Sequence, residues 1–410
     1  MKQAPPLASV SLHSSTQSHE RRLTWLAYAC IFVEGINAGW IGPFLPEISR
    51  LVHVSIDHAG LIVSATAAGY LAALLAAGET SHRWSAQNTL AASMLLVSAG
   101  LAGLSFAPVL IGLLCAAFVA GLGYGAIDVA SNAMVVDLNR DRLAAALNYL
   151  HVMFGVGALL GPIIAGFALS HHIRYSIMFG AGAAFSALIV ILFVTTPTVE
   201  IRMPSTRGGG FISMLTRPLI WVVGAVLFLY VGDETGIGAW LFLYLRIDSA
   251  LSESLASWGV SLYWAGLILG RLIGGRLAHH IAAREFTMLA SAVSAAALIV
   301  LIAAPTMHGL AAPMIVLIGF GYGPIFPNMI AVGAERFPSE VGRMTSIVVA
   351  GGALGGIFVP WIMGHAIVVA SPRAAMEFAL GVTAFMALIS VAGLRTRRRS
   401  QNGSAHPELT

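Results

Sequence analysis

The sequence is poor in charged residues and in cysteine. Only 10% of its 410 residues are charged, whereas a soluble globular protein typically carries about 25%. Hydrophobic residues make up 58% of the chain. The two cysteines, Cys30 and Cys115, both lie in apolar stretches, so we expect them to pack as free thiols and not to form a disulfide. This composition excludes an ordinary soluble domain and indicates an integral membrane protein.

Long polar stretches are equally scarce. A helix needs about 20 mostly apolar residues to cross a bilayer, and windows of this kind follow one another along almost the whole chain. They are continuously apolar, without the alternation that is typical of barrel strands. We therefore predict an all-α membrane protein with twelve spanning helices, over residues 23–49, 56–78, 86–107, 109–136, 142–169, 173–195, 217–246, 252–278, 285–305, 309–335, 341–370 and 374–394.

Basic residues are distributed unevenly between the two ends of the predicted helices. If both termini lie on one side, 17 of the 22 Lys and Arg residues fall on that side. The other side holds Arg50, Arg174, Arg246 and Arg373, and Arg271 lies within a helix. Because cytoplasmic loops are enriched in Lys and Arg, we expect a bacterial inner-membrane protein with both termini in the cytoplasm. The net charge of +4 then reflects topology and not nucleic-acid binding.

The longest polar interruption divides the chain into two halves. Residues 197–216 are basic and rich in Pro and Gly, which is typical of a linker. We expect six-helix bundles over 23–196 and 217–395. The polar segment 1–22 has no apolar region of a signal peptide and is expected to be a disordered cytoplasmic tail, and 396–410 a second tail.

The two halves repeat one another in sequence. The segment GLGYGAI (121–127) matches GFGYGPI (319–325), and AGYLAALLAAG (68–78) matches AGLILGRLIGG (265–275) at a nearly equal shift. Because six predicted helices separate the copies, both copies run in the same direction through the membrane. Parallel repeats of this kind are related by an axis along the membrane normal. We therefore expect two pseudo-repeats around a central cavity near the midplane.

Few polar or ionisable residues fall inside the predicted helices. Ionisable groups are costly at membrane depth and are therefore functional candidates. They are Glu34 and Asn37 in the first helix, Asp128 and Asn132 in the fourth, His151 in the fifth, Asp233 and Glu234 in the seventh, and Arg271 in the eighth.

Asp128 is the first candidate for coupling to protons, because it lies near the middle of an uncharged run. An acid there can take up a proton from one side and release it to the other. The alternative is that Asp128 is a structural acid, hydrogen-bonded between helices. Glu34 and Asn37 share one face of the first helix, and for them too we consider either a functional role or a hydrogen bond between helices. His151 is expected to bind substrate, to pair with Asp128 or simply to pack. For Arg271 we expect snorkelling or a structural ion pair.

Four predicted helices carry further motifs. These are AIDVASN (126–132), LNYLHVMFGVGALLGPIIAG (147–166), YVGDETGIGAW (230–240) and GYGPIFPN (321–328). Over residues 23–395 the chain resembles the fucose:proton symporter family of the major facilitators and its sodium-glucose-transporter-like relatives. In that family an acid in helix 4 is followed four residues later by Asn, and the resemblance assigns these positions to Asp128 and Asn132.

The resemblance also bears on the fifth and seventh helices. His151 takes the place of a family Gln in helix 5. The family pattern in helix 7, Gly-x-Glu followed by Gly-x-Trp, favours Glu234 and Trp240 as the residues that face substrate. Neighbouring helical residues point about 100° apart, so Asp233 is expected to face a neighbouring helix or the outer vestibule.

These observations together predict a monomeric secondary transporter of the major facilitator fold that takes up a small neutral solute, a monosaccharide, with protons. An efflux carrier that exchanges protons for a drug or metabolite would use the same acids. No nucleophile–base set, Walker motif or metal-ligand cluster in the sequence indicates an enzyme, a cofactor or a metal site. The expected proton-coupling residues are Asp128, Glu34 and Glu234. The expected substrate-binding residues are Asn37, Asn132, His151, Glu234, Trp240, Tyr322 and Asn328.

Overall fold

The computed structural model describes residues 7–80, 84–139, 143–198, 211–277, 281–338 and 340–393. The regular structure in these ranges is helical. The helices are α1 (Leu7–Val52), α2 (Ile56–Thr80), α3 (Ala86–Phe106), α4 (Leu110–Leu138), α5 (Leu143–Ser170), α6 (Tyr175–Val194), α7 (Phe211–Leu215), α8 (Pro218–Ile247), α9 (Glu253–Leu277), α10 (Ala283–Ala303), α11 (His308–Tyr322), α12 (Ile325–Arg336), α13 (Val341–Val369) and α14 (Pro372–Gly393).

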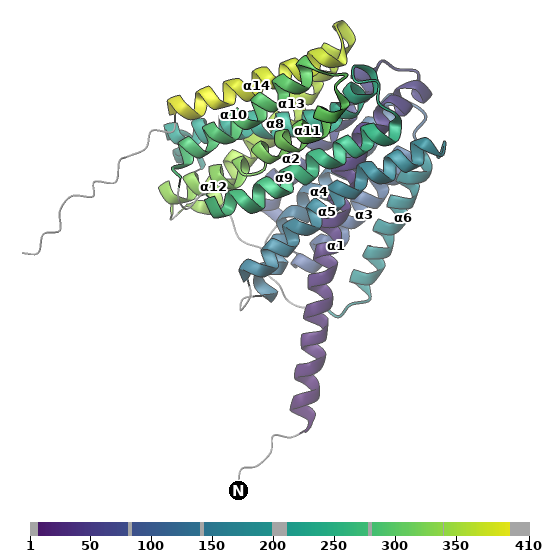
Figure 1. Ribbon diagram of the computed structural model, residues 1–410. Helices are drawn as coiled ribbons and strands as arrows, with labels where there is room; N and C mark the ends of the chain where they lie inside the picture. Colours follow the sequence, from purple (N-terminus) through teal and green to yellow (C-terminus); the bar gives the residue numbers. More distant parts are fainter. Residues whose placement is uncertain are drawn as a thin grey trace, which may run out of the picture.

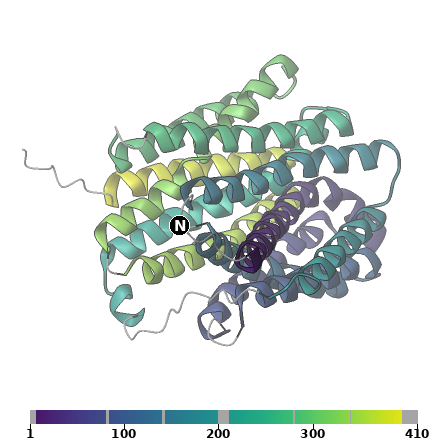
Figure 2. The same cartoon turned by 90° about the horizontal axis from the view of Figure 1, so that it is seen from below.

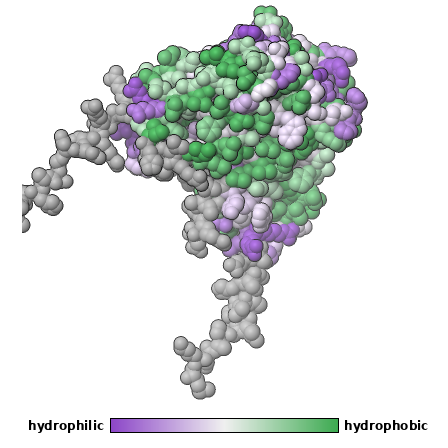
Figure 3. Space-filling view, in the orientation of Figure 1, coloured by the Kyte–Doolittle hydropathy of each residue, from purple (hydrophilic) through white to green (hydrophobic). Residues whose placement is uncertain are grey.

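These helices confirm the predicted membrane fold. Eleven segments of the described chain are long and apolar enough to cross a membrane, with α11 and α12 counted as one. α1 is the twelfth long helix, and Glu34 and Asn37 make its apolar part less hydrophobic than the others. Figure 3 shows hydrophobic residues over the flank of the molecule and hydrophilic residues near its ends. The flank is therefore the surface that lipid covers.

The structure departs from the sequence-based expectation at three places. α1 begins at Leu7 and extends beyond the bundle (Figure 1), so the expectation of a disordered segment over 1–22 is wrong from Leu7 onward. The tenth predicted span is interrupted between Tyr322 and Ile325, where Pro324 has no N–H to continue the helix. The predicted linker contains α7, while 199–210 and 396–410 lie outside the described residues.

The helices pack as two groups. In the first half α1 packs on α5, and α4 packs on α2 and α3; in the second half α8 packs on α13, and α11 packs on α9 and α10. The two groups meet through α2 on α13, α5 on α9 and α1 on α8. Figure 2, seen along α1, shows the helices of the second half, green to yellow, gathered on one side of α1.

Glycines at matching positions bring matching helices together in the two halves. A Cβ on Gly121 of α4 would collide with the backbone of Thr66 on α2, and a Cβ on Gly319 of α11 would collide with the backbone of Tyr263 on α9. Each of these residues is related to its counterpart by the sequence repeat. The repeat predicted from the sequence is therefore a repeat of helix contacts.

The contact between the halves follows the same symmetry. Ser64 Oγ donates a hydrogen bond to the carbonyl oxygen of Ile357 over 2.7 Å. Ser261 Oγ donates one to the carbonyl oxygen of Leu159 over 2.9 Å. Because the repeat relates the two serines and the two acceptors, a pseudo-twofold axis passes between the halves.

The halves are closed against each other at the end of the bundle where α1 ends. The indole of Trp240 on α8 lies where a Cβ on Gly60 of α2 or on Gly364 of α13 would collide with it. Its Nε1 donates a hydrogen bond to the carbonyl oxygen of Pro360 over 2.9 Å, and the side chain is only 1% exposed. Trp240 therefore seals this end of the interface.

Replacement of Gly319 by alanine tests the importance of close helix contact. Overpacking of this kind costs typically about 1–3 kcal/mol, and we expect Gly319→Ala to lower the thermal unfolding midpoint of the purified protein. The matched control is Gly381→Ala in α14, where a Cβ meets nothing within 4 Å. Alanine favours a helix over glycine by about 0.8–1.0 kcal/mol, so the control should unfold at the same temperature or higher. Equal midpoints for both variants would contradict the packing argument.

Candidate functional site

A hydrogen-bonded acid lies in the middle of the first half. The carboxylate of Asp128 on α4 accepts a hydrogen bond from Tyr70 Oη of α2 over 2.7 Å. Asn132, one turn further along α4, donates from Nδ2 to Asp128 Oδ1 over 3.2 Å. Both Asp128 and Asn132 are partly exposed. The acid is thus held by a phenol and an amide but remains within reach of solvent.

A second acid of the first half lies beside Asp128. Glu34 on α1 is close enough to Asp128 for the two carboxyl groups to repel each other when both are ionised. Its Oε2 is buried, and Tyr124 Oη near it is also buried; neither atom has a hydrogen-bond partner among the described residues. Glu34 and Asp128 therefore belong to the same polar region of the first half.

An ion pair occupies the facing part of the second half. Arg271 Nη2 on α9 lies 3.2 Å from Glu234 Oε1 on α8 and 3.3 Å from Tyr230 Oη. Tyr263 Oη donates to the backbone carbonyl oxygen of Glu234 over 3.3 Å. Of the two interpretations predicted for Arg271, the structure has the ion pair. The side chains remain 31% and 12% exposed, so both reach water.

His151 on α5 connects the two halves electrostatically. Its ring is influenced by the charge of Asp128 in the first half and by that of Arg271 in the second half. The residue is exposed, which rules out the expectation that it simply packs. His151 is therefore an exposed polar side chain that the charges of both halves influence.

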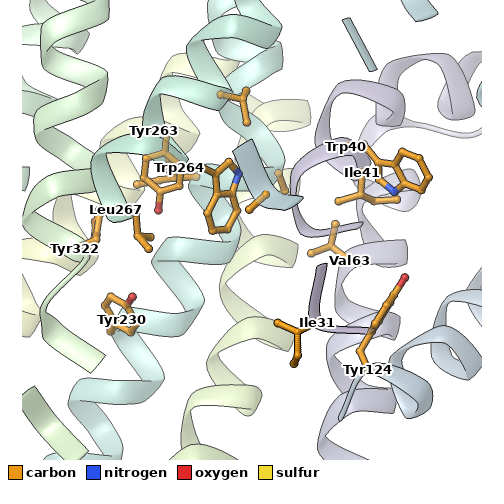
Figure 4. Close-up of a cluster of buried hydrophobic side chains, with 14 of the residues drawn as sticks. Ile31, Trp40, Ile41, Val63, Tyr124, Tyr230, Tyr263, Trp264, Leu267 and Tyr322 are labelled. Atoms are coloured by element: carbon orange, nitrogen blue, oxygen red, sulfur yellow. The ribbon is translucent and has the colours of Figure 1, made fainter. Parts of the chain in front are cut away.

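Aromatic side chains line the same region. Trp264 on α9 meets Phe154 on α5 edge-to-face, with ring centroids 6.3 Å apart. Figure 4 shows Trp264 and Tyr263 on one side of this region and Tyr124 on the other. Trp264 Nε1 and Arg271 Nε are buried without a hydrogen-bond partner among the described residues. The region therefore offers an aromatic face and unused donors.

Four other residues predicted for the site have hydrogen-bond partners of their own. Trp240 seals the end of the interface, and Tyr322 bonds to Asp233 within the second half. Asn328 Nδ2 donates hydrogen bonds to Thr287 Oγ1 and to the carbonyl oxygen of Ala283, and both acceptors belong to α10. In the first half, Asn37 Oδ1 accepts a hydrogen bond from Trp40 Nε1.

Sequence reasoning overlooked the tyrosines that hold the acids. Tyr70 and Tyr230 each place a hydroxyl on a residue of the site. Tyrosine is common in spanning helices, so its presence carries little information without the fold. The sequence offered one indication of such a role: Tyr70 is the only residue with a hydroxyl group in the repeated segment 68–78.

Comparison with known proteins gives a consistent result. The family model described as Major Facilitator Superfamily matches residues 27–250 and 225–409. Sodium-dependent glucose transporter 1A of Mus musculus is 22% identical over 376 residues, which cover 82% of this chain and 88% of that protein. Glucose/mannose transporter GlcP of Bacillus subtilis is 23% identical over 359 residues, covering 82% and 86%.

A solved structure has the same fold. The crystal structure of a D-xylose-proton symporter superposes with a TM-score of 0.76 at 14% sequence identity. The superposition covers 91% of this chain and 98% of the other. At this identity the likeness concerns the arrangement of the helices alone.

A double-mutant cycle tests the ion pair between Arg271 and Glu234. Each single change, Arg271→Gln or Glu234→Gln, leaves the partner charge unpaired in a partly buried place and should lower the unfolding midpoint. The double variant should lose less than the sum, with a coupling of about 0.5–3 kcal/mol. The control cycle uses Arg373 and Glu377, a pair that is 48% and 52% exposed, where we expect at most about 0.5 kcal/mol. Equal coupling in both cycles would contradict our interpretation.

Proposed function

The chain belongs to the Major Facilitator Superfamily and is a multi-pass membrane transporter, and we propose that it takes up a monosaccharide together with protons. One observation carries the proposal. The first half holds the acids Asp128 and Glu34, the second half holds the ion pair of Arg271 and Glu234, and the exposed His151 is influenced by the charges of both halves. The pair Asp128 and Glu34 supplies a place for a proton, and Arg271 with Glu234 supplies charge-assisted hydrogen bonds for a bound solute.

The free polar atoms at this level support a polyhydroxylated substrate. Glu34 Oε2 can accept hydrogen bonds, Arg271 Nε and Trp264 Nε1 can donate them, and Tyr124 Oη can do both. Buried polar groups are normally satisfied, and sugar hydroxyls both donate and accept. The indole of Trp264 is only 5% exposed, and it would offer its apolar face to the C–H surface of a sugar ring once the halves move apart. Relatives named as glucose and glucose/mannose transporters support the same class of substrate.

The bonding of Asp128 supports proton coupling. An ionised carboxylate only accepts hydrogen bonds, and a protonated one also donates. Uptake of a proton therefore changes what Asp128 offers to Tyr70, Asn132 and a substrate hydroxyl. One relative is named as sodium-dependent, so the coupling ion must be tested directly.

Alternating access is proposed from the asymmetry of the interface. The end at which Trp240 lies is closed, while His151 and Arg271 remain accessible to solvent. Transport requires that the seal at Trp240 opens while the other end closes. The pseudo-twofold contacts of Ser64 and Ser261 provide the surface over which the halves would rock. We place both termini in the cytoplasm of a bacterial inner membrane and treat the transporter as a monomer.

Uptake into proteoliposomes tests this function. We expect radiolabelled monosaccharide to accumulate when the outside is made acidic, with or without sodium, because the proton gradient drives entry. The controls are liposomes without protein and proteoliposomes in which a protonophore has removed the gradient. If sodium alone supports accumulation, the carrier is sodium-coupled. If no monosaccharide enters faster under any ion gradient, the sugar proposal fails and proton-driven efflux becomes the better interpretation.

Asp128→Asn serves as the matched variant in the same experiment. It keeps a side chain that can bond to Tyr70 but cannot be ionised. We expect exchange of labelled for unlabelled substrate to continue, while accumulation against a gradient is lost. Accumulation at the normal rate would show that Asp128 is not the coupling acid.

The two adjacent acids of α8 should differ in substrate binding. Glu234 forms the ion pair with Arg271 and keeps some exposed surface, whereas Asp233 is 0% exposed and bonds only within the second half. We therefore expect Glu234→Gln to raise the substrate Kd strongly and Asp233→Asn to leave it nearly unchanged, as measured by calorimetry on the purified protein. The reverse order would mean that Asp233 faces the substrate.

A further inference from the structure

We propose that Asp233, Tyr322 and Thr383 form a second proton-binding site, separate from the acids of the first half. The three residues come from α8, α11 and α14 and meet inside the second half. This site goes beyond the function proposed above, and its first test needs no substrate.

The three side chains form a tight cluster of oxygen atoms. Asp233 Oδ2 lies within hydrogen-bonding distance of both hydroxyl groups, 2.5 Å from Tyr322 Oη and 2.9 Å from Thr383 Oγ1. The two hydroxyl oxygens also lie 2.5 Å from each other. All three residues are 0% exposed. The cluster is thus sealed from solvent and from lipid.

A count of hydrogen atoms shows that the cluster has too few donors. Its oxygens make three close contacts with one another, and Thr383 Oγ1 makes a fourth with the carbonyl oxygen of Ala379. The two hydroxyl groups supply only two hydrogen atoms. With a proton on Asp233 Oδ2, hydrogen bonds can run from Asp233 to Tyr322, from Tyr322 to Thr383 and from Thr383 to the carbonyl oxygen of Ala379, so that three of the four contacts hold a hydrogen instead of two.

The surroundings also favour a proton on Asp233. No basic side chain among the described residues is paired with it, and its Oδ1 has no hydrogen-bond partner there. The titratable groups nearest to it are Tyr322 on α11 and Tyr263 on α9, with Glu234 adjacent in sequence. An ionised carboxylate without a cation is costly at membrane depth. A proton removes that charge.

The spacing of the oxygens favours a proton over a metal ion. Oxygen ligands of an ion such as Ca²⁺ surround it at about 2.3–2.6 Å and are held apart by the ion between them. The oxygens of Asp233, Tyr322 and Thr383 instead lie 2.5–2.9 Å from one another. This is the separation of atoms that share a hydrogen.

The site lies at the helix break and is connected to the central ion pair. Tyr322 is the last residue of α11, immediately before the interruption that precedes α12. Its ring lies 6.1 Å from that of Tyr230, which accepts a hydrogen bond from Arg271. Figure 4 shows Tyr322, Tyr230 and Tyr263 close together. Loss of the proton would change the bonding of Tyr322 and therefore the junction between α11 and α12.

Infrared difference spectroscopy of the full-length protein in lipid tests the site. We expect the carboxyl C=O band of a protonated buried acid near neutral pH, absent in Asp233→Asn and retained in the control Asp128→Asn. Thr383→Val should shift the frequency of this band, because it removes one hydrogen-bond partner while leaving the acid. If Asp233→Asn shows the same carboxyl bands as the wild-type protein, or if the wild-type protein shows no such band at any pH at which it is folded, the proposal is overturned.

Two further measurements complete the test. Addition of sodium chloride in place of choline chloride at constant pH should leave the Asp233 band unchanged, and its loss would identify a sodium site instead. In proteoliposomes with the identified substrate, Asp233→Asn should bind normally but change the pH dependence of turnover, while the contribution of Asp128 to that dependence remains. An unchanged pH profile would show that the acid is only structural. If no substrate is transported even by the wild-type protein, the spectroscopic result still decides whether the site exists.

Discussion

Close contact between helix backbones is the constraint on which the rest of this structure depends. Helices in lipid gain little from hydrophobic burial against each other and associate through packing of small residues. Gly121 and Gly319 allow α4 to meet α2 and α11 to meet α9 without an intervening Cβ. These contacts shape each half as a rigid group of helices. They also set the positions from which Asp128 and Tyr322 reach their partners.

The same packing gives three acids at similar depth three different environments. Asp128 is held by a phenol and an amide and reaches solvent, Glu234 is neutralised by Arg271, and Asp233 has only hydroxyl partners and is sealed. A carboxyl group behaves according to what surrounds it. The neighbouring residues Asp233 and Glu234 therefore have different places: Glu234 belongs to the interface between the halves, and Asp233 belongs to the interior of the second half.

Tryptophan and glycine together explain why only one end of the interface is closed. The indole of Trp240 fits because Gly60 and Gly364 leave room for it, one from each half. Toward the level of His151 the side chains between the halves are polar and exposed. The interface is therefore closed at Trp240, while His151 and the Arg271–Glu234 pair keep exposed surface, and a carrier must be able to reverse this asymmetry.

The sequence by itself determined the twelve spans, the repeat of two halves and most of the acids, because apolar runs and rare charges are visible without a fold. It did not reveal the extension of α1 to Leu7 or the partners of the acids. Tyr70, Thr383 and Tyr230 are ordinary residues in spanning helices, and only the tertiary structure brings them to a carboxylate. The tertiary structure also decided that Trp240 seals one end, since burial of a side chain depends on helices that are distant in sequence.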